Sequence, residues 1–255
     1  MRVSDFTHAV VRTPGVSVVN GLREDAAATP RHGAVLREHM AYVAALAAAG
    51  LAVDVLPPLE DFPDSVFVED PAFVVPEGAI LLRPGAPSRL GEREHLRAAL
   101  AKHFGRVLEV VDGHADGGDV LIAPKVIYIG LSKRTDLAGA QALKAHLETL
   151  GRAARIVETP KGVLHFKTAC SLLDEETVLA TEAMQGMFAE LRTLIAPEPA
   201  AANALRVNDT VFVGAQYKRT VDLLARDYNV VALDTGEIAK LDAGLSCMSL
   251  RWASR

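Results

Sequence analysis

The sequence predicts an α/β protein made of a repeated unit in which a helix is followed by short strands. Apolar residues at helical spacing alternate along the chain with short apolar runs of strand length. This order recurs five times, in units of about 35–55 residues, which indicates an internal structural repeat. Sequence identity between the units is slight, so the prediction depends on the pattern of elements.

The first helix shows the signals that place all five. Leu36, Met40, Val43 and Leu46 fall at helical spacing, and Gly50 ends the pattern. Glycine ends the next two helices in the same way. We expect helices over 33–50, 90–104, 135–150, 185–194 and 219–227.

Short apolar runs bounded by turn residues predict the strands that follow each helix. We expect strands near 51–57, 66–75, 79–82, 106–111, 119–123, 126–129, 153–158, 168–173, 177–180, 207–213, 229–233 and 247–252. The 255 residues suffice for one large domain with a substantial core, and we expect a single catalytic domain over 1–255.

The composition excludes several classes of partner. The net charge is −5, whereas nucleic-acid binding needs a basic surface. The N-terminus lacks the apolar core of a signal peptide, and no apolar run approaches the roughly 20 residues that span a bilayer. The two cysteines, Cys170 and Cys247, form no metal-type pair or disulfide framework. We therefore expect a cytoplasmic protein with free thiols, bound to neither nucleic acid nor membrane.

Three carboxylates lie within the seven residues Asp64-Ser-Val-Phe-Val-Glu-Asp70, between Pro63 and Pro71. If this segment is a strand, Asp64, Val66, Val68 and Asp70 share one half-buried face. Partly buried carboxylates need a cation close by. Either an Arg or Lys of this protein or a ligand supplies that charge.

The loop after the first strand of each predicted unit carries the polar residues of interest. If the units surround an axis, these loops meet at one place. The loops are 61–64 (leading to Glu69 and Asp70), 112–119, 161–165, 202–206 and 242–247. Their convergence predicts an active site that combines acids, a histidine and a cysteine.

Cys247 is a candidate nucleophile and His165 a candidate acid–base group. The ordinary alternatives are a buried apolar role for Cys247 and a hydrogen-bonded structural role for His165. Cys170 lies inside a predicted strand, so we expect a core residue there. His114, in the glycine-rich loop, is the other histidine that could act in catalysis.

The segment Asp116-Gly-Gly-Asp119 allows a tight turn or a close approach to a ligand. It lacks the Lys-Ser/Thr and the following helix of a phosphate-binding loop. A metal site from Asp, His and Cys would mix hard and soft ligands across three loops, which argues against it.

A cysteine surrounded by carboxylates suits one kind of substrate. The carboxylates raise the pKa of the thiol and so disfavour attack on a neutral amide. A cationic guanidinium reverses this effect, because its charge favours the thiolate. At about 4 Å and an effective dielectric of about 20, such a pair is worth on the order of 4 kcal/mol before desolvation. The combination therefore points to attack on a guanidinium carbon.

Six motifs, in order along nearly the whole chain, resemble the dimethylarginine dimethylaminohydrolase family. They are Phe62-Pro-Asp-Ser-Val-Phe-Val-Glu-Asp-Pro71, Arg83-Pro-Gly-Ala-Pro-Ser-Arg89, Asp116-Gly-Gly-Asp-Val120, Gly130-Leu-Ser-Lys-Arg-Thr135, Leu164-His-Phe-Lys167 and Gly244-Leu-Ser-Cys-Met-Ser249. The family belongs to the guanidine-modifying (amidinotransferase) superfamily. The resemblance implies a five-bladed α/β propeller with pseudo-fivefold symmetry.

The resemblance also implies roles for individual residues. Cys247 is similar to the nucleophile, His165 to the general acid/base, and Asp116 to the acid that supports the histidine, although bacterial relatives can have Glu there. Substrate-binding positions are implied at Leu22, Asp64, Phe67, Glu69, Asp70, Arg89, Arg134 and Leu241. Among these, Asp70 would hold the guanidinium, while Arg89 and Arg134 would grip the α-carboxylate. The alternative for the two arginines is that they neutralise nearby acids.

The implied reaction is hydrolysis of Nω-methylated arginine to citrulline and a methylamine through a covalent cysteine thiouronium. We expect no metal and no organic cofactor, and a small molecule as the partner. A homodimer is compatible with the sequence, which does not determine the oligomeric state. The alternatives are an arginine deiminase-like hydrolase acting on free arginine and a non-catalytic binder of arginine-like cations. The short chain leaves no room for an inserted helical domain, which favours the methylarginine enzyme.

Overall fold

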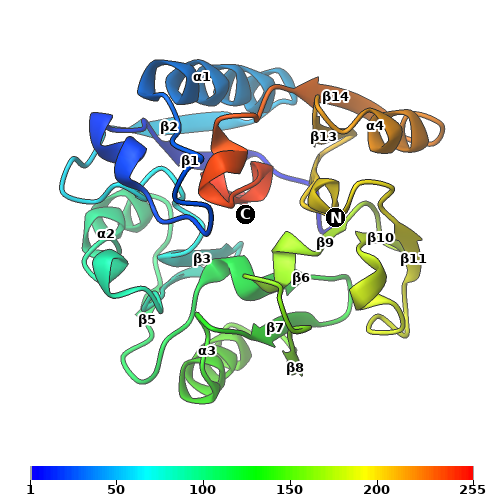
Figure 1. Cartoon of the computed structure of the whole chain (residues 1–255). Helices are drawn as coiled ribbons and strands as arrows, with labels where there is room; N and C mark the ends of the chain where they lie inside the picture. The colour runs from blue at the N-terminus through cyan, green and yellow to red at the C-terminus, as the bar shows by residue number, and fades with distance from the viewer. Residues whose placement is uncertain (1, 255) are drawn as a thin grey trace.

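Five three-stranded sheets surround a common axis in the computed structural model, which describes residues 2–254 (Figure 1). The helices lie at the periphery of the ring, and one strand of each sheet lies nearest the axis (Figure 1). The predicted α/β class and the five-bladed propeller are therefore confirmed.

Four of the sheets use consecutive strands of the chain. They are β3 (Ala72–Val75), β4 (Gly78–Leu81) and β5 (Val107–Glu109); β6 (Val120–Ile122), β7 (Ile127–Leu131) and β8 (Ala154–Glu158); β9 (Cys170–Leu172), β10 (Thr177–Ala180) and β11 (Arg192–Ile195); β12 (Leu205–Val207), β13 (Thr210–Gly214) and β14 (Asn229–Leu233). In each sheet the first two strands form an antiparallel hairpin, and the third strand pairs in parallel with the second.

A parallel pair needs a crossover connection, and a helix supplies it in most sheets. The helices α2 (Glu94–Ala101), α3 (Leu137–Thr149) and α4 (Lys218–Leu224) connect β4 to β5, β7 to β8 and β13 to β14. The crossover from β10 to β11 contains only the short 3₁₀ helix η5 (Glu182–Met184) among its described elements.

The two ends of the chain close the ring. The C-terminal β15 (Leu250–Trp252) pairs antiparallel with β1 (His8–Arg12), and β1 pairs in parallel with β2 (Ala52–Leu56). Helix α1 (His32–Ala48) connects β1 to β2. The fifth sheet therefore repeats the strand–strand–helix–strand order with its first strand taken from the C-terminus.

The hydrophobic core consists of five layers, each between two neighbouring sheets. Alternate side chains of one strand enter different layers, because successive residues of a strand point to opposite faces. On β1, Ala9 and Val11 pack toward α1, whereas Val10 packs toward β3 and β4. Both faces are thus buried, which explains why the strands appear in the sequence as continuous apolar runs.

Three predictions of local structure are wrong, and the phase of the repeat differs from the prediction. Of the strand predicted near 66–75, only β3 (Ala72–Val75) forms, because the residues before it make turns. The unit begins with the hairpin and not with the helix, so the predicted units are shifted by one element. No α-helix forms over 185–194, because Gly186 has φ +81° and 192–195 pair with β10 as strand β11. The predicted strand over 207–213 is a tight hairpin, with Asn208 at φ +52° between β12 and β13.

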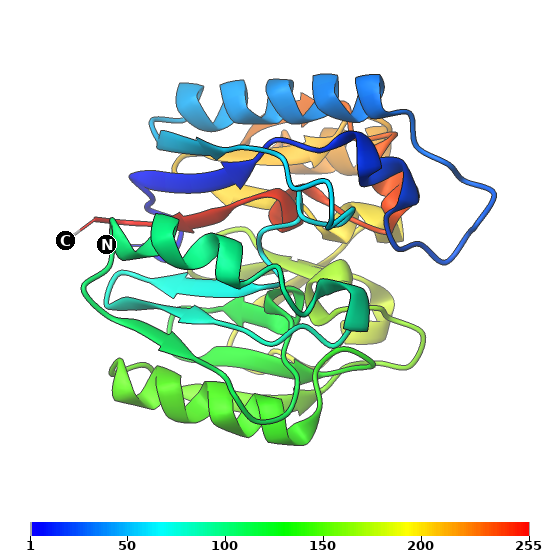
Figure 2. The same ribbon diagram turned by 90° about the vertical axis from the view of Figure 1, so that its left-hand side faces the viewer.

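Five inter-blade linkers connect the outer strand of one sheet to the inner strand of the next. We number them from first to fifth: 57–71, 110–119, 159–169, 196–204 and 234–249. Each of the last four contains a 3₁₀ helix shortly before the inner strand; these are η3 (Gly117–Asp119), η4 (Phe166–Thr168), η6 (Pro199–Ala202) and η8 (Leu245–Met248). The chain ends lie at one side of the molecule, and η1 (Val16–Asn20) with the loop after it lies at the other (Figure 2).

The four α-helices of the described residues are too short or too polar to cross a lipid bilayer.

Candidate active site

The five inter-blade linkers are joined to one another by a closed ring of hydrogen bonds. In order around the axis, Gly117 N donates to Asp70 O (3.1 Å), His165 Nε2 pairs with Asp116 Oδ2 (3.0 Å), Asn203 Nδ2 donates to Lys167 O (3.0 Å), Ser246 N donates to Asn203 Oδ1 (3.2 Å), and Glu69 N donates to Cys247 O (3.2 Å). The loops that the sequence predicted to converge therefore do so.

The acidic segment of the first linker is a series of turns and not a strand. Phe67 N donates to Asp64 O (2.9 Å), and Ser65 N donates to Phe62 O (3.0 Å), which are turn hydrogen bonds. The prediction that alternate residues share one face is wrong, because residues 64–70 are all buried. The turns send Asp64, Glu69 and Asp70 in three different directions, each to its own partners.

Asp70 lies against both Arg89 and the glycine turn of the second linker. Its Oδ2 pairs with Arg89 Nη1, and its Oδ1 accepts from Gly118 N (3.1 Å). A Cβ at Gly118 would lie 2.9 Å from Asp70 Oδ1 and 2.9 Å from Cγ of His165, so the close approach of these two side chains requires glycine. Burial opposes ionisation, but Arg89 and His165 outweigh it and lower the pKa of Asp70.

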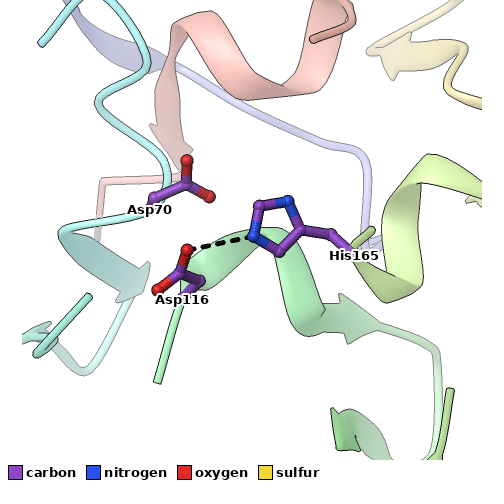
Figure 3. A group of neighbouring side chains, drawn as sticks. All are labelled: Asp70, Asp116 and His165. Carbon is purple, nitrogen blue, oxygen red and sulfur yellow. Dashed lines mark hydrogen bonds and ion pairs between the residues drawn. The ribbon is translucent and has the colours of Figure 1, made fainter. Parts of the chain in front are cut away.

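His165 is held by Asp116 at the junction of the second and third linkers (Figure 3). The shorter side chain of Asp therefore reaches the imidazole. Asp116 is fully buried, and its Oδ1 accepts from Gly85 N (2.7 Å), which orients the carboxylate. Burial alone would lower the pKa of His165, but Asp70 and Asp116, with Asp119, outweigh burial and raise it to about 9. His165 is thus an imidazolium at neutral pH.

Cys247 lies on η8, directly before the inner strand β15, and is partly exposed. Gly244 N lies 3.5 Å from its Sγ and points toward it. Burial, followed by Glu69 and Asp70, raises the pKa of Cys247 to about 12. Asp70 therefore acts on both the thiol and the imidazole, in opposite senses: it stabilises the imidazolium and disfavours the thiolate.

Glu69 contacts the linker that carries Cys247. Its carboxylate accepts from Ser246 Oγ (3.0 Å) and pairs with Lys167 and Arg251. Both oxygens are therefore engaged by protein groups, and the side chain is 4% exposed.

The two arginines predicted to grip a carboxylate differ sharply. Arg89 is 4% exposed, and its guanidinium contacts Asp70, both oxygens of Glu92, and the carbonyls of Asp64 and Phe67. Only one N–H, on Nη1, has no acceptor among residues 2–254. Arg89 is therefore paired with acids inside the protein, as in the alternative to carboxylate binding, and can offer a ligand one hydrogen bond at most.

Arg134 presents a free guanidinium. Within the described part of the chain, no hydrogen-bond or ion-pair partner meets its side chain, although its charge acts on Asp64. Its main chain is fixed, because Arg134 N donates to Ser132 Oγ (2.9 Å) and its carbonyl would lie 2.3 Å from a Cβ at Gly85. The forked cation remains available for a carboxylate.

The remaining predicted residues lie around Asp64. Leu22 N donates to Asp64 Oδ1 (2.9 Å), which attaches the loop after η1 to the acidic segment. Leu22 is 38% exposed, whereas Leu241, at the end of η7 (Ile238–Leu241), is buried and would lie 3.0 Å from a Cβ at Gly21. Phe67 is a core residue of the layer beneath α1, with 3% exposure, so its side chain packs in the protein interior.

Asp70, Asp116 and His165 each offer a ligand atom, and these atoms lie within 4.8 Å of one another (Figure 3). All three side chains already have protein partners: Arg89 and Gly118 on Asp70, and the Asp116–His165 pair itself. The donor set therefore fits a network of ion pairs and hydrogen bonds better than a metal centre.

The other two candidates from the sequence lie outside this group. Cys170 is a fully buried core residue on β9, as predicted. His114 pairs with Asp136 (3.0 Å) on the N-terminal side of α3 and does not contact His165.

Sequence reasoning assigned no role to Glu92, Asn203 and Arg251, which contact the site residues directly. Glu92 lies three residues after Arg89, a spacing that pairs side chains in helical turns, and this was an available signal. Asn203 and Arg251 act through tertiary contacts.

Comparison with known proteins adds independent information. Residues 55–211 match the family model described as arginine deiminase. A protein of Pseudomonas aeruginosa named N(G),N(G)-dimethylarginine dimethylaminohydrolase is 38% identical over 254 residues, which cover 97% of this chain and 100% of that protein. A protein of the same name from Streptomyces coelicolor is 36% identical over 253 residues, covering 95% and 96%.

Solved structures extend this similarity to the fold. The Pseudomonas aeruginosa enzyme, as a cysteine-to-serine variant complexed with citrulline, superposes with a TM-score of 0.92 at 38% identity, covering 96% of this chain and 99% of that one. A histidine-to-glycine variant of a dimethylarginine dimethylaminohydrolase, as an adduct with S-methyl-L-thiocitrulline, gives a TM-score of 0.93 with the same identity and coverage.

Proposed function

Because this chain belongs to the dimethylarginine dimethylaminohydrolase family, we propose that it hydrolyses Nω-methylated L-arginine to L-citrulline and dimethylamine or methylamine. The observation that carries the proposal for this chain is the field around Cys247. Burial, followed by Glu69 and Asp70, raises the pKa of the thiol, and the two carboxylates favour a cationic carbon beside it. A guanidinium meets that condition, and a neutral amide does not.

In this mechanism the substrate itself activates the nucleophile. The positive charge of the guanidinium near Sγ opposes the effect of Glu69 and Asp70 and lowers the pKa of the thiol. The thiol proton passes to solvent as the substrate binds. The N–H of Gly244 supports the thiolate from the other side. The thiolate attacks the guanidinium carbon and forms a neutral tetrahedral adduct.

His165 supplies the proton that the leaving group needs. Because the pKa of His165 is raised to about 9, its imidazolium is populated at neutral pH. It protonates the departing methylamine or dimethylamine, and the C–N bond breaks to leave a cationic thiouronium on Cys247. The neutral imidazole then takes a proton from water, whose oxygen attacks the same carbon.

The second tetrahedral species expels the thiolate of Cys247. Citrulline forms as its hydroxyl proton passes to solvent. Cys247 regains a proton from solvent when the cationic substrate is gone, and His165 is again an imidazolium. Asp116 holds the ring throughout. No step requires a redox change, and the atoms balance with one water consumed.

We assign the substrate's α-carboxylate to Arg134, because its guanidinium has no other partner among the described residues. Asp70 would orient the guanidinium beside Cys247. The backbones of Leu22 and Leu241 would contact the substrate, Leu241 near Cys247, and Asp64 belongs to the same substrate-binding motif. A cytoplasmic location, a homodimer and a single catalytic domain over 1–255 stay predictions. The pairing of β15 with β1 supports the last of these.

A citrulline-formation assay with asymmetric dimethylarginine, monomethylarginine and arginine tests the proposal. We expect both methylated substrates to give citrulline with kcat/KM well above that of arginine, and Cys247→Ser to give none. Residues 55–211 match the arginine deiminase family model, so free arginine is the alternative substrate to test. Faster turnover of arginine would favour that activity, and binding without citrulline would favour a non-catalytic binder.

A further inference from the structure

Arg251 spans the loop that carries the nucleophile. It is the middle residue of the inner strand β15, with a side chain that is 11% exposed. Its Nη1 donates to Ser246 O (3.2 Å) and to Ser249 O (2.7 Å), and it also contacts Ser249 Oγ. These acceptors lie one residue before and two residues after Cys247, so one nitrogen fixes both sides of the nucleophile.

The other end of the same guanidinium reaches the acidic segment. Arg251 Nη2 lies 3.3 Å from Glu69 Oε1. Glu69 in turn donates its main-chain N–H to Cys247 O (3.2 Å) and accepts from Ser246 Oγ (3.0 Å). Arg251 and Glu69, which pair with each other, thus bind the loop at Ser246, Cys247 and Ser249.

The contacts with the loop set the position of this guanidinium, although one of its N–H groups is left without a hydrogen-bond acceptor among residues 2–254. Arg251 Nε is buried without an acceptor among the described residues, which is unfavourable for a cationic donor. A guanidinium placed only for packing or solubility would turn this N–H to water. Its two Nη groups have fixed acceptors on either side, and they hold Nε in the dry position.

The fold contains a natural comparison for this residue. Arg206 is the middle residue of the inner strand β12, the equivalent position in the neighbouring sheet, and its side chain is 12% exposed. Its guanidinium contacts Asn208 O, Asp209 and the Tyr228 ring, none of which belongs to the linker ring. An arginine at this strand position therefore does not by itself bind the linker.

We propose that Arg251 is a positioning residue for the nucleophile: its fork holds the carbonyls of Ser246 and Ser249 and, with Glu69, sets where Sγ of Cys247 lies relative to the attacked carbon. The inference rests on the proposed function in that Cys247 is the attacking group. An error of about 1 Å in such a position can cost on the order of 100-fold in rate. The effect should fall on kcat, because the contacts of Arg251 are with the loop around Cys247 and with Glu69.

The test compares Arg251→Met, Arg251→Lys and the control Arg206→Met. With asymmetric dimethylarginine we expect Arg251→Met to lose about 100-fold in kcat with KM within about threefold, and Arg206→Met to stay within about threefold in both. Arg251→Lys keeps the charge and the buried stem, but one ammonium cannot replace a planar fork. We expect it to remain at least about 10-fold below the wild type in kcat.

Alkylation of Cys247 by iodoacetamide gives a readout that needs no turnover. The charged groups that act on the thiol are Glu69, Asp70 and Lys167. With Arg251→Met, Glu69 loses one of its two cations, so the alkylation profile should move to higher pH, while Arg251→Lys should restore it. Activity lost in the lysine variant with a restored profile identifies positioning as the cause.

Two results would overturn the inference. One is a kcat within about threefold of the wild type in folded Arg251→Met and Arg251→Lys. The other is a loss that Arg251→Lys fully restores in both assays, which would mean that charge alone matters. If Arg251→Met does not fold, Arg251→Lys decides by the same criteria. A wild type that forms no citrulline would instead refute the proposed function.

Discussion

Asp70 and Arg89 form an ion pair in which each side chain is only 5% exposed. Arg89 is shared with Glu92, whose side chain is 2% exposed, so one cation balances two buried carboxylates. Asp70 is also the acid that acts on both Cys247 and His165. The position and charge of Asp70 therefore depend on an arginine that belongs to the protein interior.

Replacing Arg89 should cost stability as well as activity. Arg89→Met leaves Asp70 and Glu92 buried without their cation, and we expect the free energy of unfolding to fall by about 3–5 kcal/mol. Arg97 is the control: it pairs with Glu94 and Glu109 but is 42% exposed, so Arg97→Met should cost less than about 1 kcal/mol. Urea unfolding of both variants measures the difference. If Arg89→Met and Arg97→Met lose similar free energies of unfolding, the buried ion pair contributes no more to stability than the exposed one.

Arg134 should act on one end of the substrate. We expect Arg134→Gln to raise KM for dimethylarginine strongly and to change little for an analogue that lacks the α-carboxylate. The cycle between variant and analogue should give a coupling of about 1.5–3 kcal/mol, the range for a hydrogen bond to a charged group. Arg89 offers one N–H at most, so Arg89→Lys should show smaller coupling. Equal losses with both substrates would place the carboxylate elsewhere.

The sequence predicted the repeat and the convergence of the loops, because both depend on local signals. Helix α1 forms where the spacing of apolar residues predicted it, but its buried face is not the predicted stripe: Met40 is 62% exposed, whereas Val35 and Tyr42 are buried. Strand β10 was predicted at the bounds the structure has. The helix over 185–194 failed because Met187, Phe188 and Leu191 mimic helical spacing. They pack instead into the layer between β7 and β10, which contains no α-helix among the described residues.

The site shows the same division between local and tertiary information. Asp116 stands next to Gly117, and His165 and Cys247 lie on the linkers shortly before β9 and β15, where the motifs place them. The ion-pair partners of the charged residues could mostly not be predicted. Local spacing could indicate the pair of Arg89 with Glu92, but nothing local shows that Arg89 also faces Asp70 while Arg134 stays free. Nor does a local signal show that Arg251 reaches back past Cys247 to Glu69. These contacts join residues up to 182 positions apart.

Cys247 should be slow to alkylate in the free protein. Because the pKa of its thiol is raised to about 12, the rate with iodoacetamide should still be rising at pH 10. A small cationic amidine that leaves Sγ uncovered should move the profile to lower pH, since it opposes the field of Glu69 and Asp70. Cys170 is the internal control, because burial also raises the pKa of its thiol and the side chain is inaccessible. A plateau below neutral pH would instead indicate a resting thiolate–imidazolium pair.

Asp116 should raise the pKa of His165 and so favour its protonated form at neutral pH. The folded-state pKa of His165 is about 9, above its ordinary value of 6.5. The stability that the imidazolium contributes is therefore fully present below pH 6.5 and is lost as the pH rises through 9. At about 1.4 kcal/mol per pKa unit, the whole contribution is about 3 kcal/mol. Asp116→Asn removes one of the three carboxylates responsible, so it should lower the pKa of His165 by about 1 unit or more.

Two measurements check this expectation. NMR titration of the imidazole in the Cys247→Ser background gives the pKa of His165 with and without Asp116→Asn. Urea unfolding at several pH values should then show that the stability lost on Asp116→Asn in that background shrinks from pH 6 to pH 10, because the imidazolium is lost with or without the substitution. If the pKa of His165 does not change, Asp70 and Asp119 alone keep it raised. A difference in stability that is constant with pH would mean that Asp116 serves Gly85 and the turn, and not the charge of His165.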